Sequence, residues 1–231
     1  WGTIFIGAII AMIVAIPLGL MSAIFLTQYA SLTVRKWMKP ILEILAGVPT
    51  VVYGYFAALT IAPAVRDFAV MLGVSNAASD NALAAGIVMG VMIIPLVSSM
   101  SDDSIAAVPN AMRDGSLAMG ATKSETIKNV LLPAALPGVV GGVLLAVSRA
   151  IGETMIVVMA TGNTPLMSMN IFNGMRTLSA NIAVELPEAA QHSTLYRTLF
   201  LGALLLFLLT FVVNTVAELL RQHLREKYKT V

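Results

Sequence analysis

The chain has 231 residues, of which 58% are hydrophobic and only 11% charged, with a mean hydropathy of +0.88 and a net charge of +2. Soluble domains carry about a quarter charged residues, so this composition excludes an ordinary soluble domain and predicts an all-α, polytopic membrane helix bundle with no nucleic-acid partner. The sequence has no cysteine, which excludes disulfides and thiolate metal sites.

Five apolar runs have the length of about 17 to 25 residues that a helix needs to cross a bilayer. They are Thr3–Leu26, Ile41–Ala62, Ala82–Met100, Gly138–Ala160 and Leu199–Leu220. Each contains or adjoins Gly or Pro, which membrane helices tolerate where neighbouring helices cover the backbone. The runs therefore predict one packed domain over residues 1–231. Because the chain begins at Trp1, already in an apolar run, we expect an upstream part to be missing.

The basic residues are unevenly distributed between the connections. If the five runs alternate in direction, ten of the fourteen Lys and Arg residues fall on one side: Arg35, Lys36, Lys39, Arg113, Lys123, Lys128, Arg221, Arg225, Lys227 and Lys229. The other side receives only Arg66, Arg176 and Arg197. The positive-inside rule then predicts that the three basic segments and the C-terminus are cytoplasmic.

The connection between the third and fourth runs, residues 101–133, is predicted to form two short helices. Pro109 suits a first helical position, and Gly120 allows the left-handed backbone that ends a helix. Thr122 and Glu125 have the spacing of a capping box, which begins the second helix. Pro133 is expected to separate that helix from the next span. The hairpin could cover the end of the bundle, or it could dock in a groove of a cytosolic partner.

The same connection resembles the EAA loop of ABC importer permeases, whose pattern is Glu-Ala-Ala, three residues, Gly, and a later Pro. Here Asp114, Gly115 and Ser116 take the first three positions, and Gly120 and Pro133 keep the Gly and the closing Pro. The chain departs from the pattern in Asp for Glu and in Gly-Ser for Ala-Ala. The resemblance implies a type I importer (MetI-like) transmembrane domain, in which this loop couples the permease to an ATP-binding subunit.

Three further stretches resemble phosphate permeases of the PstC type: EILAGVPTVVYGYFA (43–57), SRAIGETM (148–155) and AVELPEAAQHSTLYRTLFLGALLLF (183–207). This resemblance implies a subunit of a phosphate importer in the bacterial inner membrane. Its implied partners are a second permease of the PstA type, two ATP-binding subunits of the PstB type and a periplasmic phosphate-binding protein, which would dock on Pro63–Asn81 and Thr161–Thr194. A PstA-type chain or a permease for another oxyanion remains an alternative.

Arg149 and Glu153 are two charges inside the fourth apolar run. Each costs roughly 2.5 to 3.5 kcal/mol at mid-bilayer, so both must face the bundle or a wet cavity. On one helix, residues four apart share a face, and the two would form an ion pair. The pair could serve helix packing alone. Alternatively, the Arg149 guanidinium could bind phosphate with its planar fork, with Glu153 orienting it. The resemblance places both residues near the translocation path.

Several other functions lack the residues they need. No G-x-x-x-x-G-K-[ST] motif occurs, so ATP hydrolysis is assigned to partner subunits and the chain is not itself an enzyme. No catalytic set for an intramembrane enzyme is present, no cofactor is implied, and the two histidines, His192 and His223, lie too far apart in sequence to suggest a metal site. An ion-coupled carrier or channel that uses Arg149 and Glu153 as a proton relay stays open.

Overall fold

The computed structural model describes residues 2–74, 76–166 and 170–228, and Lys229 lies outside them. The described residues form helices and no strands. In chain order the α-helices are α1 (Gly2–Ile24), α2 (Leu32–Gly47), α3 (Thr50–Phe56), α4 (Ala62–Met71), α5 (Ala82–Ala106), α6 (Asn110–Ala118), α7 (Lys123–Thr126), α8 (Leu132–Ile151), α9 (Met155–Ala160), α10 (Leu178–Glu185) and α11 (Thr194–Tyr228). Short π or 3₁₀ turns join some of them: η1 (Phe25–Tyr29), η2 (Ala57–Ile61), η3 (Ile127–Leu131) and η4 (Leu186–Glu188).

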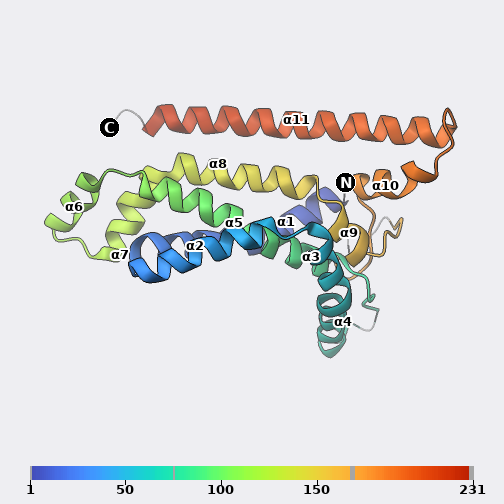
Figure 1. Cartoon of the computed structure of the whole chain (residues 1–231), viewed down its shortest axis with the longest axis horizontal. Coiled ribbons are helices and arrows are strands. Elements are labelled where there is room, and N and C mark those ends of the chain that lie inside the picture. Colours follow the sequence, from blue (N-terminus) through green and yellow to red (C-terminus); the bar gives the residue numbers. More distant parts are fainter. Residues whose placement is uncertain (1, 75, 167–169, 229–231) are drawn as a thin grey trace.

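Four helical segments within the described residues are long and apolar enough to cross a membrane. They are Ala8–Tyr29, Ala82–Ala106, Lys123–Ile151 and Thr194–Leu224, and a bent pair, Leu32–Gly47 with Thr50–Met71, gives up to a fifth. The predicted all-α, multi-span architecture is therefore confirmed. Helix α5 packs on α1 and α8, and α8 packs on α11. In Figure 1 the last turns of α11 lie on the same side as α6, and the first turns of α11 lie on the same side as α10. We call these the α6 end and the α10 end of the bundle.

Helix α5 is the centre of the bundle. It packs against α1 and also contacts α8 and α2. Of the residues in its most apolar stretch, 61% are buried inside the chain. Small residues make this contact close: a Cβ added at Gly90 would lie 2.7 Å from Cβ of Val14 on α1. By contrast, only 6% of the residues in the most apolar stretch of α11 are buried. Much of the apolar surface of α11 is thus left for lipid or for another subunit.

The predicted second run, Ile41–Ala62, is not one straight helix. The chain turns at Val48 and Pro49, and the helices on the two sides make an angle of 87°. Val48 is extended, with φ −65° and ψ 129°, because the residue before a proline avoids the helical region, and Pro49 has no N–H to donate. As a result α3 and α4 lead away from the long helices, as Figure 1 shows.

The helix bounds around the predicted connection, residues 101–133, differ from those expected. Helix α5 continues to Ala106, α6 follows, and a long helical segment begins at Lys123. Pro133 does not separate two helices, since the chain stays helical from Lys123 to Ile151. The π turn η3 places Pro133 within the first two positions of α8, where a missing N–H is tolerated.

Candidate functional site

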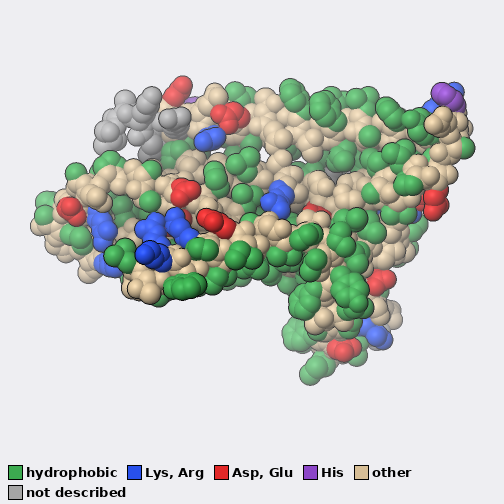
Figure 2. Space-filling model, viewed as in Figure 1, with side chains coloured by type: hydrophobic (Ala, Val, Ile, Leu, Met, Phe, Trp, Pro, Cys, Tyr) green, Lys and Arg blue, Asp and Glu red, His purple; other side chains and the backbone are tan. Residues whose placement is uncertain are grey.

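Arg149 lies in the last turn of α8, where a cation is favoured by the negative end of the helix dipole. Its side chain lines a cleft of about 440 Å³ between α8 and α11. The polar residues of this cleft are Ser148, Arg149, Asn214, Glu218 and Arg221. Figure 2 shows the surface hollowed along the lower side of α11. Asn214 lies well inside the helical segment Thr194–Leu224, which is long and apolar enough to cross a membrane, so the cleft has polar groups on an apolar helix.

Glu153 lies in the break between α8 and α9 and is only 7% exposed. Its Oε1 accepts hydrogen bonds from the backbone N–H groups of Met155 and Ile156, at 3.1 and 3.3 Å. The carboxylate therefore satisfies two N–H groups that the first turn of α9 leaves without helical partners. The Glu153 carbonyl in turn accepts a hydrogen bond from the Ser179 hydroxyl of α10, at 3.0 Å.

The expected ion pair between Arg149 and Glu153 is not formed. Helix α8 ends at Ile151, and Gly152 begins a turn, so the two residues do not share a helical face. Across the described residues, no carboxylate lies within 4.0 Å of the Arg149 guanidinium. The sequence does not indicate this break, because glycine is tolerated inside many membrane helices and Gly152 does not by itself predict an interruption. The Arg149 guanidinium is therefore without a carboxylate partner among the residues that the structure describes.

A helix break at membrane depth limits what the surroundings can be. In lipid, unpaired backbone groups cost several kcal/mol, so irregular backbone is found where it is buried in protein or lines a cavity. Here Glu153 and Ser179 satisfy part of the broken backbone, and Arg149 faces the cleft on the other side. The predicted Gly138–Ala160 span is thus two helices with a polar junction.

The loop residues predicted to dock a partner are exposed at the α6 end. Asp114 and Gly115 lie on the outside of α6, and a Cβ added at Gly115 would meet nothing within 4 Å. Gly120 follows α6 with φ +88°, as its predicted role in ending the helix requires. Met119 beside it is 90% exposed. Pro109 is the residue before the first turn of α6, one position earlier than predicted.

The second loop helix begins as the sequence predicts. Thr122 Oγ1 accepts a hydrogen bond from the Glu125 N–H at 3.3 Å, and a Glu125 carboxylate oxygen accepts one from the Thr122 N–H at 2.8 Å. This reciprocal pair is a complete capping box. Ser116 on α6 lies 3.0 Å from the buried Thr126 hydroxyl, so a hydrogen bond joins the two loop helices. The exposed loop therefore has a defined shape.

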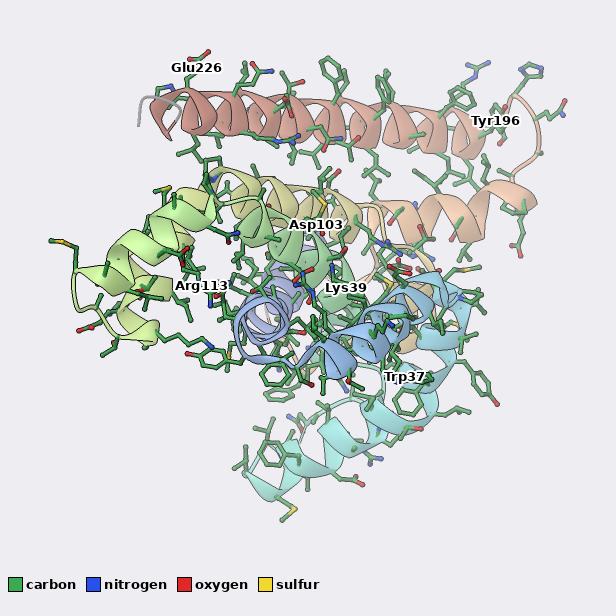
Figure 3. All side chains as sticks on the ribbon, turned by 60° about the vertical axis from the view of Figure 1, so that its left-hand side comes forward. Trp37, Lys39, Asp103, Arg113, Tyr196 and Glu226 are labelled. Carbon is green, nitrogen blue, oxygen red and sulfur yellow. The ribbon has the colours of Figure 1, made fainter. Side chains whose placement is uncertain are left out.

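Four side-chain contacts that the sequence did not predict join α2, α5, η1 and α7 at the α6 end of the bundle. Asp102 near the end of α5 is buried and pairs with Arg35, at 3.3 Å, and with Lys39 of α2. Lys39 also lies 3.8 Å from Asp103, and Figure 3 shows these two side chains approaching one another. Lys123 at the start of α7 lies 4.4 Å above the Tyr29 ring. The signal in the sequence was Arg35 and Lys39, four apart on one helix face.

The two segments predicted to face a binding protein meet at the α10 end. Backbone N–H groups of Ala78, Ala82 and Leu83 donate to the carbonyls of residues 171–173, at 3.0 to 3.1 Å. Arg176 bonds to Glu185 at 2.9 Å and to Asn163 at 3.1 Å. The described parts of the two segments, which are distant in sequence, thus lie together at this end. Residues 75 and 167–169 are not among the described residues.

Comparison with known proteins identifies membrane transport proteins that are similar to this chain in sequence. Residues 15–229 match the family described as the inner membrane component of binding-protein-dependent transport systems. The chain is 35% identical over 204 residues to the probable ABC transporter permease protein YqgH of Bacillus subtilis, covering 88% of this chain and 64% of YqgH. It is 32% identical over 241 residues to the phosphate transport system permease protein PstC of Xylella fastidiosa, covering 98% of this chain and 74% of PstC. The predicted resemblance to PstC-type permeases is confirmed.

Solved structures show the same fold at lower identity. An inward-facing form of the MetNI methionine ABC transporter aligns with a TM-score of 0.67 and 18% identity, covering 97% of this chain and 93% of that chain. A bacterial ABC transporter that imports the acidic polysaccharide alginate aligns with a TM-score of 0.59 and 13% identity, covering 94% and 78%. The fold is that of a type I importer transmembrane domain, as the loop resemblance implied. By its sequence match over residues 15–229, this chain belongs to the family of inner membrane components of binding-protein-dependent transport systems.

Proposed function

We propose that this chain is a permease subunit of an ATP-driven phosphate importer, with residues 1–231 as one domain that forms half of the path through the bacterial inner membrane. The observation that carries the proposal is the guanidinium of Arg149, which faces a polar cleft at membrane depth without a carboxylate partner among the described residues. An unpaired cation at this depth is costly unless a ligand uses it. The names of the PstC relatives point to phosphate as that ligand.

Arg149 is the residue that binds the anion on its way through. A guanidinium offers two parallel N–H donors that fit two oxygens of a tetrahedral oxyanion. Glu153 contributes differently from an ion pair: it fixes the start of α9 and so holds the polar junction next to Arg149. Its remaining charge also disfavours very tight anion binding near the junction.

The loop at the α6 end takes the role of coupling to the ATP-binding subunit. Asp114, Gly115 and Ser116 would contact that subunit, Gly120 sets the turn after α6, and Pro133 lies in the continuous helix that leads from the loop into the bundle. The exposed Met119 and Met112 give α6 an apolar side that fits a groove. This end, with the C-terminus, is then cytoplasmic, and the α10 end meets a phosphate-binding protein. A PstA-type permease completes the path, and two PstB-type subunits hydrolyse ATP.

The test is uptake of labelled phosphate into membrane vesicles that hold the complete importer. We expect Arg149→Gln to abolish uptake while the chain still copurifies with its ATP-binding subunits. Lys36→Gln, which removes an exposed charge of α2 outside the cleft, is the charge-matched control and should transport normally. Normal uptake by Arg149→Gln would refute the proposal. Unlabelled sulfate or molybdate that competes as well as phosphate would change the cargo, and uptake without the ATP-binding subunits would indicate an ion-coupled carrier.

A further inference from the structure

The cleft beside Arg149 is built from two facing helical stripes. On α8 its lining residues are Gly141, Leu144, Leu145, Ser148 and Arg149, and on α11 they are Asn214, Ala217, Glu218 and Arg221. Both sets recur at intervals of three and four residues, the spacing of one helix face. The two helices run in opposite directions, as Figure 1 shows. One continuous polar cleft therefore lies between them.

The second arginine of the cleft lies toward the α6 end. A Cβ added at Gly141 would lie 3.2 Å from Cδ and Nε of Arg221, so the Arg221 side chain packs directly on the glycine. Gly141 precedes Arg149 by eight residues, which is about 12 Å along a helix. Asn214 precedes Arg221 by seven residues, about 10 Å, and so lies toward the Arg149 level of the antiparallel pair. The cleft has a guanidinium toward each end: Ser148 and Asn214 lie near Arg149, and Glu218 lies near Arg221.

Arg221 is only loosely held by its own helix. Its Nη1 lies 3.6 Å from Oε2 of Glu218, and both side chains are about half exposed. An ion pair of this length and exposure is weak, so it leaves guanidinium donors available to a ligand. Glu218 also accepts a hydrogen bond from Gln222 at 3.2 Å, which keeps its carboxylate near the α6 end of the cleft. With two guanidiniums and one carboxylate, the cleft stays net positive.

We propose that Arg221 is a second oxyanion-binding residue, which receives the anion from Arg149 and releases it toward the α6 end. The inference rests on the proposed phosphate transport. A single strong site would retain its ion, whereas two weaker sites along a path allow binding and release. The distance of about 12 Å between the two levels exceeds the size of one phosphate, so the arginines act in sequence rather than chelating one anion together. Glu218 limits the affinity at the exit by competing for the Arg221 guanidinium.

The first test measures phosphate uptake by the assembled importer. We expect Arg221→Gln to lower the initial rate about tenfold, the loss typical of removing one charge-assisted contact. Arg221→Lys should keep part of the rate, since it retains the charge without the planar fork. The Lys36→Gln control should transport normally. Equal rates for Arg221→Gln and Lys36→Gln would overturn the role of Arg221, whereas normal uptake by Arg149→Gln would overturn the proposed function itself.

A second test separates anion binding from helix packing, and it uses the absence of cysteine in the chain. Ala217→Cys puts a single thiol in the cleft, and Val216→Cys puts one on α11 outside it. In inverted vesicles with the full complex, inorganic phosphate should slow the reaction of the Ala217→Cys variant, but not of the Val216→Cys variant, with an anionic thiosulfonate. Adding Arg221→Gln should abolish this protection. If phosphate protects the cleft thiol equally well without Arg221, or protects neither thiol, the arginine serves packing alone.

Discussion

Asp102 is a carboxylate that is 1% exposed and lies between two cations of α2, whereas the adjacent Asp103 is 70% exposed. A carboxylate can be buried in a membrane protein only when partners replace its water. Arg35 and Lys39 are these partners, and each keeps part of its own hydration. The two aspartates thus provide a natural comparison between a buried and an exposed ion pair.

We expect Asp102→Ala to destabilise the purified importer by about 2 kcal/mol, because it leaves two cations facing an uncharged pocket. Asp103→Ala is the control and should change stability little, since exposed pairs contribute at most about 1 kcal/mol. Thermal unfolding in one detergent measures both variants. Equal melting temperatures for the two would contradict the assigned difference.

Two substitutions of Glu153 can distinguish the effect of its negative charge from the effect of its hydrogen bonds. Glu153→Gln keeps an oxygen that can accept from the N–H groups of Met155 and Ile156, so the start of α9 should stay capped. Glu153→Ala removes the acceptor and should cost about 1 kcal/mol of stability. We therefore expect a lower melting temperature for the alanine variant only. A glutamine variant that unfolds as early would show that the negative charge itself stabilises the junction.

At the scale of elements, the loop between α5 and α7 depends on one backbone angle. Gly120 has φ +88°, which costs other L-residues about 1 to 2 kcal/mol but is tolerated best by asparagine. We expect Gly120→Ala to shift α6 and to reduce phosphate-dependent ATP hydrolysis by the importer, and Gly120→Asn to restore most of it. Hydrolysis that is equally low in both variants would assign the defect to the side chain and not to the backbone.

The sequence was most informative where one local rule determines the structure. The start of α5, the capping box of Thr122 and Glu125, and the turn at Gly120 are all found as predicted, because each depends on a few neighbouring residues. The breaks at Pro49 and Gly152 were missed, since proline and glycine are common in intact membrane helices and only tertiary contacts decide which ones interrupt them.

For the candidate site, the sequence predicted Arg149 but not its surroundings. The cleft requires Asn214, Glu218 and Arg221 from α11, more than sixty residues later, and no local pattern relates the two helices. The pairing of Asp102 with α2 was missed for the same reason. Residue type identifies a charge within a span, whereas its partner depends on how the bundle packs.

For the whole molecule, the arrangement predicts which segments face the same aqueous side. Ala118 on α6 and Glu188 in η4 are both exposed and lie at opposite ends of the bundle. In this cysteine-free chain, we expect Ala118→Cys to react with an impermeant reagent only in inverted vesicles. Glu188→Cys should react only from the opposite side, in cells whose outer membrane has been made permeable and whose inner membrane is intact.

The labelling test has a clear opposite result. Reaction of both variants from one side would mean that the α6 end and the α10 end do not face opposite aqueous sides. Detergent-opened vesicles, in which both positions should react, control for the accessibility of each thiol.

The contacts of Asp102 also determine which helices would move together when the loop at the α6 end is displaced. They join α2 to α5, and Lys123 above Tyr29 joins the loop helices to the turn before α2, so a push on α6 would swing these elements as one lever. These elements meet α3 at Val48 and Pro49, where the helix is already interrupted and the Tyr53 hydroxyl of α3 donates a hydrogen bond to the Leu45 carbonyl at 2.9 Å. A hinge at this corner would let α3, which packs on α9 beside the Arg149 junction, lag behind and change the width of the passage.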